Sequence, residues 1–117
     1  SRELLEVEID QFFVLKKEDV IVACAALYPY PDAKMGEVAC VAIHPDYRSG
    51  NRGARLMAEL EHEAKQQQLT AIFVLTTVSG HWFQEQGFIE QSMNKLPEGK
   101  QKMYNFQRKS KVFFKDI

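Results

Sequence analysis

The sequence predicts one domain with a mixed α/β sheet. Two apolar runs of strand length, Val20–Tyr28 and Glu37–Ile43, are bounded by proline, glycine and polar residues, which is typical of buried strands. A later segment repeats its apolar residues at three- and four-residue spacing, as one face of a helix does, at Leu56, Met57, Leu60 and Ala64. Strands on both sides of such a helix imply hairpins as well as a crossover, and therefore a mixed sheet.

Composition narrows the class of protein. The 117 residues include 15 lysines and arginines against 16 aspartates and glutamates, for a net charge of −1, which argues against nucleic acid as a partner. No apolar run approaches the roughly 20 residues of a membrane-spanning helix. The two cysteines, Cys24 and Cys40, lie in apolar runs. They predict buried thiols in a reducing, cytoplasmic compartment, without a disulfide framework or a metal site.

The first half of the chain predicts a strand-rich region. Ser1–Glu8 mixes charged and apolar residues and suggests a short helix, and Phe12–Leu15 suggests a strand. Lys16–Asp19 forms a polar hairpin turn before the Val20–Tyr28 strand, which Pro29–Asp32 should end.

The second half predicts alternating helices and strands. The Glu37–Ile43 strand stops at Pro45, and the long helix leads to a buried strand in Leu69–Thr76, so a right-handed crossover should join two parallel strands. Ser79–Gln86 suits a short helix with Ser79 as N-cap and Gly87 as the C-terminal breaker. The last strands are expected at Phe88–Ile89 and Lys111–Phe114.

The loop before the long helix has the character of an anion site. A strand ends, a stretch containing Gly50 and Gly53 turns, and a helix begins, so free backbone N–H groups and the helix dipole favour phosphate there. Arg48 and Arg52 add positive charge. The alternative is a solvated turn with surface arginines, because short glycine-containing motifs are weak signals.

The surrounding segment VAIHPDYRSGNRGARLM resembles the acetyl-CoA-binding motif of the GCN5-related N-acetyltransferases (GNAT), Arg/Gln-x-x-Gly-x-Gly/Ala. Arg48 takes the first position and Gly53 the last, while Asn51 replaces the middle glycine and should tolerate a positive φ. The resemblance implies that backbone N–H groups of this turn bind the pyrophosphate of acetyl-CoA. The acetyl-CoA site it implies comprises Cys40, Val41, Ile43, Arg48, Asn51, Arg52, Gly53 and Ala54.

Two further segments resemble the same family. Trp82–Phe88 is similar to its aromatic-x-x-x-Gly-Phe signature, and Gly36–Ile43 stands where the family has its central splayed strand. The implied architecture is the GNAT fold without its first strand and helix. In that fold a backbone N–H near Cys40 binds the thioester carbonyl, and the Cys40 thiol itself is expected to pack rather than to attack.

Glu37 is the candidate general base. It opens an otherwise apolar strand, where a carboxylate is unfavourable unless it is paired or used. Acetyl transfer needs a base because the amine arrives as an ammonium. The alternative is that Glu37 lies at a solvated strand end beside Gly36.

The acid that protonates the leaving thiolate is less well defined. Many family members have a tyrosine where this chain has Phe83, which cannot donate a proton. Thr76, at the end of the preceding strand, is the candidate donor, while Thr77 and Ser79 are expected to form the turn.

Nearly the whole chain, including LPEGKQKMYNFQRKSKVFF, resembles the acetyltransferase domain of the bacterial N-acetylglutamate synthases. This implies acetylation of the α-amine of L-glutamate in arginine biosynthesis, with Arg108 and Ser110 binding glutamate, although a solvated basic edge is the alternative. The chain would then be part of a larger enzyme, without its amino-acid-kinase-like domain and without any homo-oligomer built through that domain. Another amine substrate, or a non-catalytic acetyl-CoA-binding module, stays open.

Overall fold

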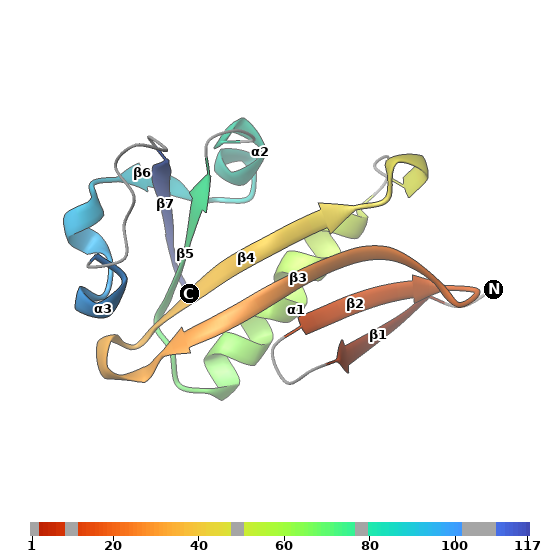
Figure 1. Cartoon of the computed structure of the whole chain (residues 1–117), viewed down its shortest axis with the longest axis horizontal. Coiled ribbons are helices and arrows are strands. Elements are labelled where there is room, and N and C mark those ends of the chain that lie inside the picture. Colours follow the sequence, from red (N-terminus) through yellow and green to blue (C-terminus); the bar gives the residue numbers. More distant parts are fainter. Residues whose placement is uncertain (1–2, 9–11, 48–50, 77–79, 102–109) are drawn as a thin grey trace.

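The computed structural model describes residues 3–8, 12–47, 51–76, 80–101 and 110–117, which form the mixed α/β fold that the sequence predicts (Figure 1). Its sheet has seven strands in the order β1-β2-β3-β4-β5-β7-β6. The strands are β1 Glu3–Glu8, β2 Phe12–Lys17, β3 Val20–Tyr30, β4 Met35–Ile43, β5 Ala71–Thr76, β6 Ile89–Gln91 and β7 Lys111–Asp116. The helices are α1 Arg52–Gln66, α2 Gly80–Glu85 and α3 Glu98–Gln101, with 3-10 turns η1 Pro31–Ala33, η2 Pro45–Tyr47 and η3 Met93–Lys95.

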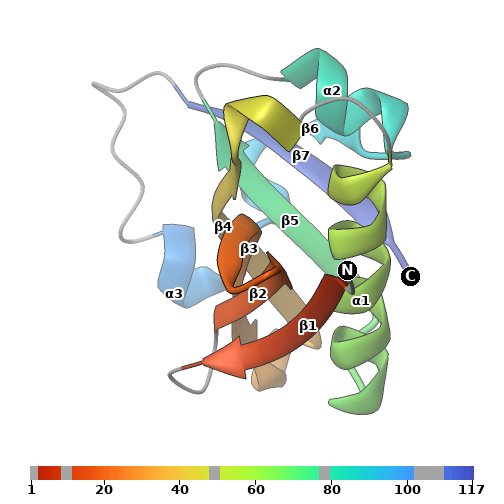
Figure 2. The same ribbon diagram turned by 90° about the vertical axis from the view of Figure 1, so that its right-hand side faces the viewer.

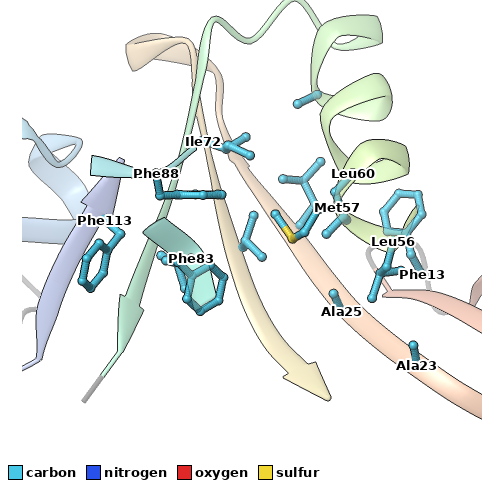
Figure 3. Packing of buried hydrophobic residues seen from close by; sticks show 14 of the residues in the cluster. Phe13, Ala23, Ala25, Leu56, Met57, Leu60, Ile72, Phe83, Phe88 and Phe113 are labelled. Carbon is cyan, nitrogen blue, oxygen red and sulfur yellow. The ribbon is translucent and has the colours of Figure 1, made fainter. Parts of the chain in front are cut away.

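The sheet separates two apolar layers of unequal size. Helices α1 and α2 cover one face and α3 lies on the other (Figure 2). The larger cluster lies under α1 and α2 and includes Leu56, Met57 and Leu60 of α1 (Figure 3). The smaller cluster, beneath the η3–α3 segment, centres on Phe73 and Leu96. Alternate residues of β5 serve the two clusters, as the two-residue period of a strand requires.

Strands β1 to β4 form an antiparallel meander, and β4 and β5 are parallel, as predicted for the crossover through α1. The parallel pairing is short: it joins Met35–Glu37 to Ala71–Phe73 and then ends. Beyond Glu37 the two strands diverge, which Figure 1 shows as a V that opens toward α2. The edge of β4 from Val38 onward therefore has no β5 partner.

The N-terminal prediction was wrong. Residues Glu3–Glu8 form a strand that pairs with β2 from Glu3↔Lys17 to Glu8↔Phe12, not a helix. The eight-residue stretch is too short for a helix that is stable without packing, whereas the free edge of β2 offers a complete ladder of hydrogen-bond partners.

Strand β3 also runs further than predicted, through Pro29 to Tyr30. Its pairing with β2 ends at Ala26, so Pro29 faces a strand on one side only, where it pairs with Gly36 of β4. A proline without an N–H group is tolerated at such a local edge.

The remaining boundaries differ by a few residues. The Lys16–Asp19 turn is confined to Glu18 and Asp19, which have φ values of 53° and 66°. The predicted breaker Gly87 has φ +95°, a conformation that favours glycine. The predicted N-cap Ser79 lies outside the described residues.

Candidate active site

The divergence of β4 and β5 leaves a cavity of about 660 Å³ between the two strands. Consecutive residues of both strands line it, and because their side chains alternate between faces, the cavity reaches both faces of the sheet. Strand β4 forms one wall of the cavity and the end of β5 forms the opposite wall. Helix α2 contributes aromatic side chains. The lining residues are Glu37, Val38, Ala39, Cys40, Val41, Ala42, Ile43, Val74, Leu75, Thr76, Trp82 and Phe83. The expected site residues Glu37, Cys40, Val41, Ile43 and Thr76 therefore share one cavity.

A bulge in β4 shapes the middle of this wall. Ala26 pairs with Ala39 and Cys24 with Ala42, so two residues of β4 oppose one residue of β3. Cys40, at the bulge, has φ 55°. The strand bends there, which turns its unpaired backbone edge toward the cavity.

The bulge also overturns the prediction of two buried thiols. Cys40 is exposed and Cys24 is half-buried, because the left-handed conformation of Cys40 takes its side chain out of the regular alternation. The Cys24 thiol donates to the Cys40 carbonyl oxygen, with Sγ and O 3.9 Å apart. Burial, and secondarily the nearby Cys40 thiol, raise the pKa of Cys24.

Glu37 is a buried carboxylate, with 8% of the residue exposed, which contradicts the alternative of a solvated strand end. Lys100 of α3 forms an ion pair with it, with Nζ and Oε1 3.1 Å apart. The same carboxylate interacts electrostatically with Tyr30, at the end of β3. Burial raises the pKa of Tyr30 first, and the negative charge of Glu37 raises it further.

Aromatic side chains pack around the strand position next to this carboxylate. Glu37 pairs in register with Phe73 of β5. The Phe73 ring lies 6.0 Å from that of Tyr30 and is stacked at 6.0 Å on that of Phe114. Because Phe73 is fully buried, this wall of the site has little freedom to rearrange.

The helix side of the cavity is also aromatic. Phe83 is buried and makes edge-on contacts with Trp82, at 5.0 Å, and with Phe88, at 5.4 Å. Phe83 brings no hydroxyl to the cavity that it lines, whereas Thr76 at the end of β5 does.

The start of α1 lies against this aromatic wall through Gly53. A Cβ atom there would lie 2.7 Å from Trp82 Cζ2 and 2.9 Å from Ile43 Cδ1, so only glycine lets helix and cavity wall approach this closely. Arg52 lies over the Tyr47 ring at 4.9 Å, and Ala54 is exposed. The backbone N–H groups of the first helical turn lack carbonyl partners within the helix.

Asn51 does not use the tolerance for positive φ that the sequence suggested. Asn51 precedes α1 with φ −100° rather than a positive φ, and its carbonyl accepts the first helical bond from Arg55 N, at 2.8 Å. The turn thus needs no left-handed residue at this position, which is why the replacement of the family's glycine leaves the helix start intact.

Two expected binding residues, Arg48 and Arg108, lie outside the described residues. Ser110 is half-buried and comes immediately before β7. Sequence reasoning missed Lys100 altogether, because it lies in a polar segment whose pattern gives no sign that it folds back over Glu37.

In the described part of the chain, no group of three or more His, Cys, Asp or Glu side chains could hold a metal ion. Among the same residues, no helix is both long and apolar enough to cross a membrane.

Comparison with known proteins gives consistent matches. Residues 2–88 match the model of the acetyltransferase (GNAT) family. The amino-acid acetyltransferase of Photobacterium profundum is 56% identical over 112 residues, and that of Escherichia coli (strain K12) is 54% identical over 117 residues; these matches cover 96% and 100% of this chain. The crystal structure of N-acetylglutamate synthase from Neisseria gonorrhoeae, complexed with coenzyme A and N-acetyl-glutamate, superposes with a TM-score of 0.85 at 31% identity over 97% of this chain.

The matches cover only part of those relatives. The chain spans 25% and 26% of the two amino-acid acetyltransferases and 29% of the synthase chain. The family model nevertheless extends over well over half of the present sequence, including the splayed strand, the helix start and the aromatic-Gly-Phe segment. The chain belongs to the GNAT acetyltransferase family.

Proposed function

We propose that this protein transfers the acetyl group of acetyl-CoA to the α-amine of L-glutamate, in the cytoplasm, as a step of arginine biosynthesis. The observation that carries the proposal is the buried Glu37 carboxylate in the wall of the cavity between β4 and β5. The amino-acid acetyltransferases at 54–56% identity, and the synthase complexed with N-acetyl-glutamate, support glutamate as the acceptor.

The acyl donor fits the unpaired edge of β4. Past Glu37 this edge has no β5 partner, so a pantetheine amide chain can hydrogen-bond to it as an added strand would. A backbone N–H at the Cys40 bulge would polarise the thioester carbonyl. The pyrophosphate would lie at the start of α1, on the backbone N–H groups from Asn51 to Ala54 with Arg48 and Arg52 nearby.

The acceptor amine would approach Glu37. Glu37 takes one proton from the substrate ammonium, directly or through a water molecule, and the freed nitrogen lone pair attacks the thioester carbon. The C–N bond forms, the C–S bond breaks, and its electron pair leaves on the coenzyme A thiolate. The nitrogen then loses its second proton, which balances the proton that the thiolate gains. The transfer is direct, so it uses neither a Cys40 acyl intermediate nor a metal.

The leaving thiolate needs a proton. Thr76 lies in the cavity wall opposite β4 and is the candidate donor, since Phe83 of α2 has no proton to give. Arg108 and Ser110 are the candidates for holding a carboxylate of glutamate, because a guanidinium binds carboxylate through two parallel hydrogen bonds.

The test is release of coenzyme A thiol from acetyl-CoA in the presence of L-glutamate or of other amines. We expect turnover with glutamate, and a fall in kcat of about 10²- to 10⁴-fold in Glu37→Gln, which keeps the shape of the side chain and removes the base. Glu98→Gln, an exposed glutamate at the start of α3, serves as the matched control and should retain wild-type kcat.

The other outcomes are equally informative. Turnover with a different amine only would keep the acetyltransferase and reject glutamate as its substrate. Acetyl-CoA binding without thiol release on any amine would instead indicate a non-catalytic acetyl-CoA-binding module.

A further inference from the structure

A lysine side chain occupies the place beside the candidate base where a substrate ammonium must arrive. We propose that Lys100 determines specificity for α-amino acids: the substrate ammonium replaces Lys100 at Glu37, and Lys100 turns to the substrate's α-carboxylate. This inference rests on the proposed acetyl transfer and adds to it a residue and a selection rule.

The ion pair is close and largely shielded from water. Lys100 Nζ lies 3.1 Å from Glu37 Oε1, and the two side chains are 17% and 11% exposed. Glu37 therefore already has a cationic partner in the folded protein. The carboxylate must release the lysine before it can hold and deprotonate an ammonium.

Charge balance then selects the substrate. An amine that carries only positive charge would leave two cations facing one carboxylate in a poorly solvated site, which is unfavourable. A substrate with a carboxylate next to its ammonium brings a partner for the displaced lysine. α-Amino acids are therefore accepted, and simple amines and polyamines are rejected, by the same side chain.

Covalent geometry identifies the carboxylate. The oxygen atoms of an α-carboxylate lie within about 3–4 Å of the α-nitrogen, because only two carbon atoms intervene. A substrate nitrogen at Glu37 therefore places its α-carboxylate beside Lys100. The γ-carboxylate lies further from the nitrogen and is bound elsewhere in the proposed site.

The backbone around Lys100 is held, so the exchange needs only the side chain to move. Lys100 N bonds to Pro97 O at 2.9 Å, and Gln101 Nε2 donates to Leu96 O at 2.8 Å. Leu96 is buried in the smaller core cluster. The four-carbon stem of lysine gives the ammonium the freedom to move between the two carboxylates.

The experiment compares three acceptors in wild-type protein and in Lys100→Met, which removes the charge and keeps the length of the stem. The acceptors are L-glutamate, its α-amide (isoglutamine) and its γ-amide (glutamine), each measured as kcat/KM. In Lys100→Met we expect the preference for glutamate over the α-amide to fall by about 10-fold or more, and the preference over the γ-amide to stay unchanged. Lys100→Arg should restore much of the first preference.

Lys95→Met is the matched control, since Lys95 is an exposed lysine of the same segment, and it should leave both preferences as in wild type. Urea unfolding of each variant separates a folding defect from a binding effect. If Lys100→Met does not fold, Lys100→Gln, which also removes the charge, takes its place, and the same two preferences decide.

Three results would overturn the inference while the proposed function stands: both preferences unchanged in Lys100→Met, a fall confined to the γ-amide, or an equal fall for both amides. Wild-type turnover of another α-amino acid but not of glutamate would reject only the glutamate assignment, and that acid and its α-amide would replace the pair in the test. Turnover of carboxylate-free amines alone, or of no amine at all, would reject both proposals.

Discussion

The Tyr30 hydroxyl couples the charge on Glu37 to the pH dependence of stability. Burial and the adjacent carboxylate raise the pKa of Tyr30 above its usual value of 10.0, so the folded protein favours the protonated phenol. The resulting stabilisation is complete below pH 10.0 and is lost as pH rises through the higher folded value.

We therefore expect Tyr30→Phe to flatten the decline of the unfolding temperature above about pH 10. Thermal unfolding from about pH 8 to 11 measures this. The raised pKa of Cys24 acts with the same sign from a lower starting pH, so the comparison is made in a Cys24→Ser background as well. Curves that run parallel for Tyr30→Phe and its parent would contradict the coupling.

Gly53 shows how packing can reverse an intrinsic preference. Inside a helix, replacement of glycine by alanine usually stabilises by about 1 kcal/mol. Here the added methyl group would meet Trp82 and Ile43 at 2.7 and 2.9 Å. We expect Gly53→Ala to lower the free energy of unfolding by about 1–3 kcal/mol and to weaken coenzyme A binding.

Urea unfolding and calorimetric titration with coenzyme A test the Gly53 prediction. Ala58→Gly, at an exposed position of the same helix, is the control and should lose about 1 kcal/mol without any change in affinity. A stabilised Gly53→Ala protein with normal affinity would show that the helix start can move aside without consequence.

At the scale of elements, the bulge in β4 predicts that glycine substitutions at two neighbouring residues change the free energy of unfolding in opposite directions. Cys40 has φ 55°, which is unfavourable for a residue with a side chain, whereas Ala39 lies in regular pairing with Ala26. We expect Cys40→Gly to be neutral or to raise the free energy of unfolding by up to about 1 kcal/mol.

Ala39→Gly should instead lower the free energy of unfolding by about 0.5–1 kcal/mol, because it adds freedom to the unfolded chain and relieves nothing. The difference between the two urea midpoints is the measurement. Equal losses in both variants would mean that the left-handed conformation at Cys40 is not strained.

At the scale of the whole molecule, we expect the two apolar clusters on opposite faces of the sheet to have different roles. The larger cluster should stabilise the fold, and the smaller one should support acceptor binding. Leu60→Ala removes a fully buried side chain from the larger cluster and should lower the free energy of unfolding by about 2–5 kcal/mol. Leu96→Ala lies in the smaller cluster beneath α3 and should raise KM for the amine while coenzyme A affinity stays unchanged. An affinity for coenzyme A that falls in Leu96→Ala would contradict this separation.

The parts of the fold in which buried apolar residues form a clear pattern along the chain were predictable from sequence. The strands at Val20 and Glu37, the parallel crossover and the stripe of α1 follow from apolar patterning, and all are confirmed. The first strand was missed because its structure depends on the edge of β2, a partner distant from the local pattern. Glu37 could be recognised because a carboxylate in an apolar strand is unfavourable unless it is paired or used in the reaction.

The contacts that complete the site have no such local signal. Lys100 is one polar residue among many in its segment, and only the tertiary arrangement brings it to Glu37. The left-handed residue of β4 is likewise invisible in an apolar run, since cysteine has no preference for that conformation and the bulge is set by pairing with β3.

The passage between β4 and β5 has a consequence for how such a protein diverges. Its lining comes from β4, the end of β5 and α2, whereas the lysine that pairs with Glu37 comes from the separate segment Ser92–Gln101. Under the proposed function, substitutions in that segment would change the choice of acceptor without changing the residues that line the cavity. Acceptor specificity could then diverge among related proteins while the acyl-donor site stays the same.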